Sequence, residues 1–120
     1  MAKWANDLVM DAALDKVATA NQLIVCTAQP TDRANALSIA LASTTLTGGS
    51  FTKADGNTNG RKVTIAQQNG ISATGTGNAT HIALVDATSL IYVTTCTAQA
   101  VTSGNAINVP AWKIEISDPS

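Results

Sequence analysis

The sequence predicts a mainly β protein, a β-sandwich or β-barrel-like domain with one N-terminal α-helix. Apolar and polar residues alternate in several short segments, and Gly, Asn, Asp and Pro separate these segments. Short alternating segments with frequent turn signals are typical of sandwiches and barrels. Helical spacing of apolar residues is clear only near the N-terminus. The length of 120 residues predicts a single domain over residues 1–120.

The predicted helix covers residues 6–20. Asn6 is suited to cap its first turn, and its apolar residues recur at helical spacing. This apolar stripe consists of Met10, Ala13, Leu14 and Val17. Asp7, Asp11 and Asp15 follow one another at a spacing of four on another face, where like charges repel weakly. We therefore expect the acidic face to meet water or a cationic partner.

The remaining chain, residues 22–117, is predicted to form a β-rich body. Alternation and β-branched residues predict the following strands: 23–28, 62–66, 71–73, 81–86, 90–96, 106–109 and 112–116. Residues 37–46 fit either a helix or a strand, and their alternation favours a strand. Residues 33–37 favour a single helical turn. Asn69-Gly70 is a strong signal for a tight turn, so we expect 71–73 to pair back on 62–66.

Burial is predicted from the same alternation. The expected core residues are Val9, Leu14, Val17, Leu23, Val25, Val63, Ile65, Ile82, Leu84, Val93, Trp112 and Ile114. Replacing Trp112 by alanine is predicted to cost about 3–5 kcal/mol. Cys26 and Cys96 each precede Thr-Ala-Gln, which suggests two thiols at a similar depth in the core. Aromatic residues are only 3% of the chain, so we expect modest stability and association into a homo-oligomer.

Composition and charge exclude several function classes. Charged residues make up 12% of the chain, against about 25% in an ordinary soluble domain. With a net charge of −1 and no basic stripe, no nucleic-acid partner is expected. No long apolar or polybasic segment suggests membrane binding. The N-terminus lacks the apolar segment of a secretory signal, so we expect synthesis in a cytoplasm.

Reactive side chains are few, and no enzymatic activity, cofactor or metal is expected. His81 and Asp86, placed five residues apart on a strand, would lie on opposite faces about 16 Å from each other, too far for a catalytic pair. The two cysteines show no zinc-binding spacing. The three aspartates of the predicted helix lack a second source of metal ligands, so they are expected to be solvated.

Four residues are the candidate partner-contact residues: Trp4, Asp7, Asp11 and Asp15. Trp4 precedes the predicted helix, where it would either pack on the first turn or anchor this end of the chain on a partner. A carbohydrate site would favour exposed aromatic side chains, and Trp4 and Tyr92 are the few candidates for that role.

Five segments resemble small tailed-bacteriophage virion structural proteins of about this length. They are residues 4–14, 23–30, 60–64, 79–86 and 114–119. The resemblance implies a non-enzymatic head decoration (cement) protein that binds the outside of the major capsid lattice. Its partners would be the major capsid protein and copies of itself, and it would be assembled into the virion in the host cytoplasm. Alternatives are a tail or head–tail joining protein and a tail-associated receptor- or carbohydrate-binding module.

Overall fold

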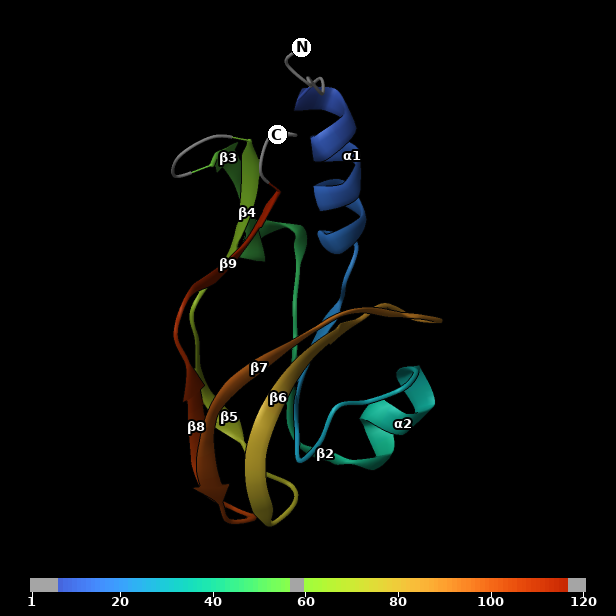
Figure 1. Cartoon of the computed structure of the whole chain (residues 1–120). Helices are drawn as coiled ribbons and strands as arrows, with labels where there is room; N and C mark the ends of the chain where they lie inside the picture. Colours follow the sequence, from blue (N-terminus) through green and yellow to red (C-terminus); the bar gives the residue numbers. More distant parts are fainter. Residues whose placement is uncertain (1–6, 57–59, 117–120) are drawn as a thin grey trace.

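The computed structural model describes residues 7–56 and 60–116, with the side chain of Asp7 left out. Its architecture is mainly β and sandwich-like, with the predicted helix at the N-terminal end (Figure 1). The elements are α1 (Asp7–Val17), β1 (Gln22–Cys26), α2 (Arg33–Ser38), β2 (Ala40–Thr45), a 3-10 turn (Gly48–Ser50), β3 (Phe51–Asp55), β4 (Arg61–Ile65), β5 (Gln68–Ser72), β6 (Gly77–Val85), β7 (Leu90–Val101), β8 (Ala106–Val109) and β9 (Trp112–Ile116). The barrel alternative is not formed, because the described sheets do not close on themselves.

Two layers of antiparallel strands make up the body. One layer is a four-stranded sheet in the order β2-β1-β6-β7. The other is a long ribbon in which β4 runs on towards β5 and β8 runs on towards β9, with β3 at one end. Figure 1 shows β8 and β9 in one line along this ribbon, while β6 and β7 cross in front of it. The two C-terminal strands predicted at 106–109 and 112–116 are confirmed as β8 and β9, with the predicted bounds.

The main core lies between the two layers and under α1. The predicted core residues found in it are Leu14, Val17, Leu23, Val25, Val63, Ile65, Ile82, Leu84 and Ile114. Trp112 is only partly buried and packs against this cluster. The prediction for Val9 is wrong, since its side chain is 66% exposed. Met10, one position further along the helix, takes the buried place beside Leu14.

The central strands β1 and β6 are buried on both faces. Leu23 and Val25 face the main core, while Ile24 and Cys26 belong to a second cluster with Ala36 of α2. A strand covered on both sides requires consecutive apolar residues rather than strict alternation, which the run 23–26 supplies. Val93, predicted as a core residue, is partly buried and packs against this second cluster.

The short helix α2 confirms the predicted helical turn. Asp32 caps it, because its carboxylate accepts a hydrogen bond of 2.7 Å from the backbone N–H of Asn35. Helix α1 ends at Val17 rather than at residue 20. The hydroxyl of Thr19 donates to the carbonyl of Lys16 at 2.6 Å, which satisfies one of the carbonyls left open at a helix end.

The pairing predicted from Asn69-Gly70 is wrong. These two residues lie inside β5, which pairs with β8 rather than with β4, and the register shifts between Gln68 and Ile71. Gly70 has a φ of +68°, and its N–H donates to the side-chain oxygen of Asn108 on β8 at 2.9 Å. The glycine therefore serves a bulge in a strand, which needs the same positive φ as a tight turn.

The structure contains one strand that the sequence analysis does not predict. This strand is β3, which pairs with β4. It lacks a clear apolar alternation, because Phe51 is its only residue that is even partly buried. The Cys-Thr-Ala-Gln repeat does not mark equivalent positions. Cys26 is fully buried at the end of β1, whereas Cys96 lies partly exposed in the middle of β7.

Candidate functional site

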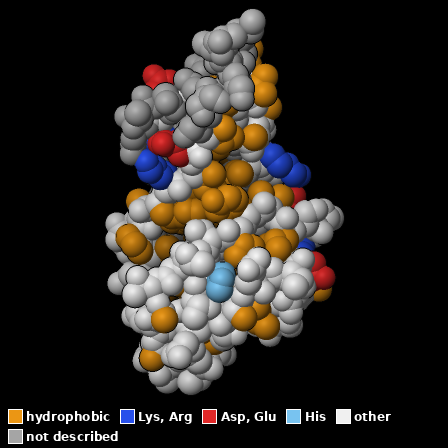
Figure 2. Space-filling model, viewed as in Figure 1, with side chains coloured by type: hydrophobic (Ala, Val, Ile, Leu, Met, Phe, Trp, Pro, Cys, Tyr) orange, Lys and Arg blue, Asp and Glu red, His pale blue; other side chains and the backbone are white. Residues whose placement is uncertain are grey.

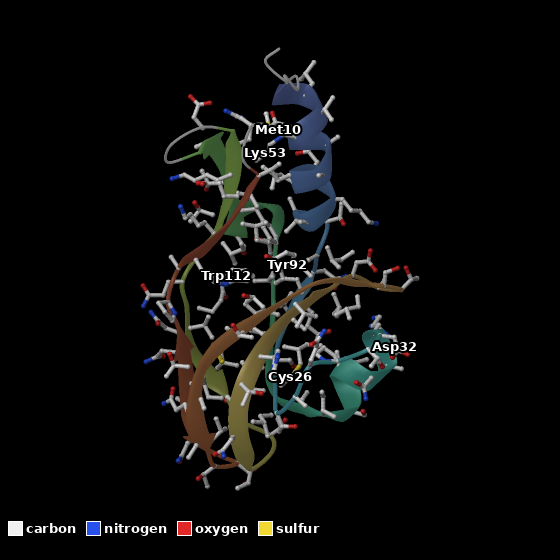
Figure 3. The ribbon with its side chains drawn as sticks, in the orientation of Figure 1. Met10, Cys26, Asp32, Lys53, Tyr92 and Trp112 are labelled. Carbon is white, nitrogen blue, oxygen red and sulfur yellow. The ribbon has the colours of Figure 1, made fainter. Side chains whose placement is uncertain are left out.

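The predicted acidic face of α1 meets cations of its own chain. Asp11 accepts a hydrogen bond of 2.9 Å from Nε of Arg61 on β4, and both side chains are less than one-fifth exposed. Asp15 pairs with Lys53 of β3, which Figure 3 places beside the helix. Trp4 and the side chain of Asp7 lie outside the described residues. Of the four candidate partner-contact residues, two therefore fix α1 on the body of the same chain.

Arg61 is the centre of this charge network. Besides Asp11, it donates from Nη1 to Asp55 at 2.6 Å. The hydrogen bonds to Asp11 and then to Asp55 raise the pKa of the guanidinium above its usual value. Asp11 and Asp15 are thus each paired with a cation of the same chain, and Arg61 is shared between Asp11 and Asp55. Leu14 and Val17 complete the attachment of the helix by entering the main core.

The opposite side of α1 is apolar and exposed. Leu8 is 75% and Val9 66% exposed, and Ala12 and Ala13 are exposed on the same side. We call these four residues the outer face of α1. Figure 2 shows hydrophobic side chains along the side of the helix that points away from β3 and β4. Exposed apolar groups gathered on one element are typical of protein contact sites.

A second candidate surface is an apolar groove between β7 and the line formed by β8 and β9. It consists of two adjoining hollows of about 220 and 300 Å³. Both are lined by Ile82, Cys96, Val109 and Pro110. We call it the β7–β8 groove. The remaining lining residues are Val25, Ala79, Thr94, Thr95, Thr97, Gln99, Ile107, Asn108, Trp112 and Lys113.

The groove exists because the two layers do not join on this side. On the far side, a bridge between Ala42 and Ala73 links β2 to the segment after β5. Within the described residues, no strand pairing links β7 with β8. Pro110 also interrupts the line between β8 and β9, since proline has no backbone N–H for a ladder.

The edge strand beside the groove carries no charge. Strand β7 has 12 residues, from Leu90 to Val101, and none of them is charged or a proline. Exposed edge strands usually carry lysine or proline, which discourages pairing with another chain. By contrast, β9 carries Lys113 and Glu115 and β3 carries Lys53 and Asp55. The edge of β7 is thus the least protected of these three edges.

Tyr92 and Trp112 lie at the upper end of the groove. Their ring centroids are 6.1 Å apart with a tilt of 31°, a favourable aromatic arrangement. Figure 3 shows the two side chains meeting between the layers, and Figure 2 shows hydrophobic side chains across the molecule at this level. The indole N–H of Trp112 is buried and, among the described side chains, is the one buried polar group without a hydrogen-bond partner.

Three reactive side chains lie on the described strands: His81, Cys26 and Cys96. His81 has its Nδ1 2.8 Å from the hydroxyl of Thr80. Burial, followed by the nearby Cys96 thiol, raises the pKa of Cys26 to about 11, and burial also raises the pKa of Cys96. Both cysteines are thiols, and a raised pKa leaves little of the reactive thiolate at neutral pH.

We expect the two thiols to differ in their reaction with iodoacetamide at about pH 8. In the folded protein Cys96 should be modified slowly and Cys26 not at all, because Cys26 is 0% exposed. In urea both should react at similar rates. Mass spectrometry of peptides against time measures both rates. Equal modification of the two thiols in the folded protein would contradict the burial of Cys26.

Asp86 connects three elements at the turn between β6 and β7. Its carboxylate accepts hydrogen bonds from the backbone N–H groups of Thr88 at 2.8 Å and Ser89 at 2.6 Å. Lys16 of α1 lies 3.6 Å from it, and Arg33 of α2 donates to its backbone carbonyl at 2.7 Å. The hydrogen bonds from Thr88 and Ser89 hold the pKa of this carboxyl below its usual value.

A lowered pKa predicts a loss of stability in acid. The contribution of Asp86 is fully present above the ordinary pKa of an aspartate and is lost as the pH falls through its lower folded value. An Asp86→Asn variant should therefore show a smaller drop in melting temperature between about pH 5 and pH 2 than the parent. Melting followed by circular dichroism at several pH values measures this. Parallel pH curves for the two proteins would contradict the role of the carboxylate.

Within the described residues, no three His, Cys, Asp or Glu side chains gather where they could hold a metal ion. No helix in the described ranges is long and apolar enough to cross a membrane.

In comparisons with known proteins, no family model, curated protein or solved structure matches this chain. The candidate site described above consists of two apolar surfaces, the outer face of α1 and the β7–β8 groove.

Sequence reasoning missed both surfaces. The uncharged run 90–101 and the break at Pro110 were the signals for the groove. The signal for the outer face of α1 was the pair Leu8 and Val9, of which Val9 was predicted to be buried.

Proposed function

We propose that this protein is a non-enzymatic structural component of a tailed-bacteriophage virion, acting as a decoration (cement) protein on the outside of the major capsid lattice. One observation carries the proposal: a single elongated body bears two separate contact surfaces with almost no charge. The body measures 53 × 25 × 24 Å. Figure 1 shows α1 at one end of the body and β7 and β8 along its flank. The outer face of α1 and the β7–β8 groove lie on these elements.

Two surfaces on one body suit a protein that bridges its neighbours. A cement protein has to contact more than one subunit of a shell, and each contact can be weak because the lattice repeats it many times. The resemblance of five segments to phage virion proteins supports the same role. The groove is the surface we assign to the shell, since its uncharged β7 edge can pair with an extended segment of another protein.

Purified virions provide the test. We expect mass spectrometry to find the protein at a copy number comparable to that of the major capsid protein, with density on the outer surface of the head. A few copies confined to the tail or to the head–tail junction would replace this proposal with the alternative of a joining or tail protein. Absence from intact particles would overturn the virion role altogether.

A binding assay tests the groove itself. The purified protein is added to particles that lack it, and the bound fraction is measured after sedimentation. Thr97→Lys places a charge at the rim of the groove and should reduce binding strongly. Thr52→Lys, on an exposed position of β3, is the matched control and should bind like the parent. Equal binding of both variants would contradict the assignment of the groove to the shell.

A further inference from the structure

We propose that the outer face of α1 is a self-association surface, on which α1 packs antiparallel against α1 of a second copy. The inference goes beyond the proposed function, because it concerns the isolated chain and does not require a capsid. It depends on three features of the helix: the four uncharged residues of this face, their self-complementary order of large and small side chains, and the area that the face offers.

Charge does not oppose a second helix here. Asp11 and Asp15 lie on the flank that faces β3 and β4, where they pair with Arg61 and Lys53. Lys16 follows Ala12 and Ala13 by one turn on the same side of the helix, where it pairs with Asp86 at 3.6 Å. The four residues between these charges are Leu8, Val9, Ala12 and Ala13. Over the length from Leu8 to Ala13, a second copy of the helix would therefore meet an apolar surface.

The order of side chains along the face fits an antiparallel copy of itself. The two large residues, Leu8 and Val9, occupy its first half, and Ala12 and Ala13 follow one turn later. In an antiparallel pair centred between residues 10 and 11, Leu8 lies opposite Ala13 and Val9 opposite Ala12 of the other copy. A two-fold contact must be complementary to itself in this way, and alanine lets helix axes approach to about 8 Å.

The area of the face predicts a weak contact. An 11-residue helix is about 16 Å long, so four side chains on one side bury far less than the roughly 800 Å² per partner of a stable complex. A lasting dimer in dilute solution is therefore not expected. Association should be seen at high protein concentration, or where copies are already held close together, as on a repeating surface.

Sedimentation equilibrium over a wide range of concentrations tests the surface. The parent should rise above its monomer mass of 12.2 kDa only at high concentration. Val9→Asp should weaken association at least tenfold, while Leu37→Asp, at a 40% exposed position on α2, is the control and should not. Unfolding curves check that both variants fold. A parent that stays monomeric throughout overturns the inference and leaves the virion proposal standing.

A residue swap distinguishes specific helix packing from nonspecific hydrophobic association. Ala13→Leu enlarges the apolar face but places leucine against Leu8 of the other copy, so association should weaken. The double variant Leu8→Ala, Ala13→Leu restores one large and one small residue at each contact and should associate like the parent. Stronger association of Ala13→Leu than of the parent would overturn the proposed packing.

Cross-linking tests the direction of the helices. In a background with Cys96→Ser, Val9→Cys is mixed with Ala12→Cys and oxidised at high protein concentration. The antiparallel arrangement predicts that disulfides between the two variants form faster than disulfides within either one. Cys26 does not compete, because it is fully buried. Faster linkage of Val9→Cys to itself would indicate parallel helices and overturn the proposed register.

Discussion

Replacing Leu84 by alanine is expected to lower the free energy of unfolding by about 3–5 kcal/mol. Leu84 is 0% exposed and lies near the C-terminal end of β6, opposite Leu23 on β1 and Tyr92 on β7. The sheet holds both neighbours in place, so they cannot move to fill the space left by the leucine side chain. The loss therefore includes the cavity as well as the buried apolar area.

Urea denaturation followed by circular dichroism measures this loss. Leu37→Ala is the matched control, because it makes the same chemical change at a position that is 40% exposed. It should cost less than about 1 kcal/mol. Domains are stable by only about 5–15 kcal/mol, so Leu84→Ala is expected to bring the protein close to unfolding. A loss below about 1 kcal/mol for Leu84→Ala would contradict the two-layer core.

The alternation of apolar and polar residues correctly predicted the strands that depend mainly on residues close to them in the sequence. The strands 106–109 and 112–116 alternate clearly, and the structure contains both. The hairpin of 81–86 with 90–96 is confirmed as β6 and β7, with both strands longer than predicted. In each case the apolar residues of the segment and an adjacent turn specify the strand without reference to distant residues.

Pairing between distant segments could not be predicted in the same way. Gly70 requires a positive φ, but the sequence does not show whether a tight turn or a bulge uses it. Helix α1 carries apolar residues on two sides, and periodicity cannot tell which side the body covers. Val9 was therefore placed in the core, although the position of β4 makes Met10 and Leu14 the buried residues.

The contacts of the candidate site also join segments that are distant in the sequence, so they could not be predicted from it. The spacing of Asp11 and Asp15 predicted an acidic face that would meet water or a cationic partner. Their partners, Arg61 and Lys53, are 50 and 38 residues away in the sequence, and only the fold brings them together. The β7–β8 groove is open because β7 and β8 do not pair. The uncharged run 90–101 and Pro110 mark its position in the sequence, but they do not show that this pairing is absent.

Replacing Trp112 by alanine is the second substitution with a large expected effect. Its side chain packs against the main core and Tyr92, so the sequence prediction of about 3–5 kcal/mol applies. Because part of the ring is exposed at the groove, we expect a value near the lower limit, about 3 kcal/mol. A thermal or urea transition equal to that of the parent would contradict the packing role of the indole.

Trp112→Phe separates the packing of the ring from its polar group. Phenylalanine keeps an aromatic face beside Tyr92 and removes the buried N–H that has no acceptor. An unsatisfied buried donor costs about 1–3 kcal/mol, so its removal should offset most of the lost ring area. The free energy of unfolding should then stay within about 1 kcal/mol of the parent. A Trp112→Phe protein as destabilised as Trp112→Ala would contradict the expectation that removing the unpaired indole N–H offsets the lost ring area.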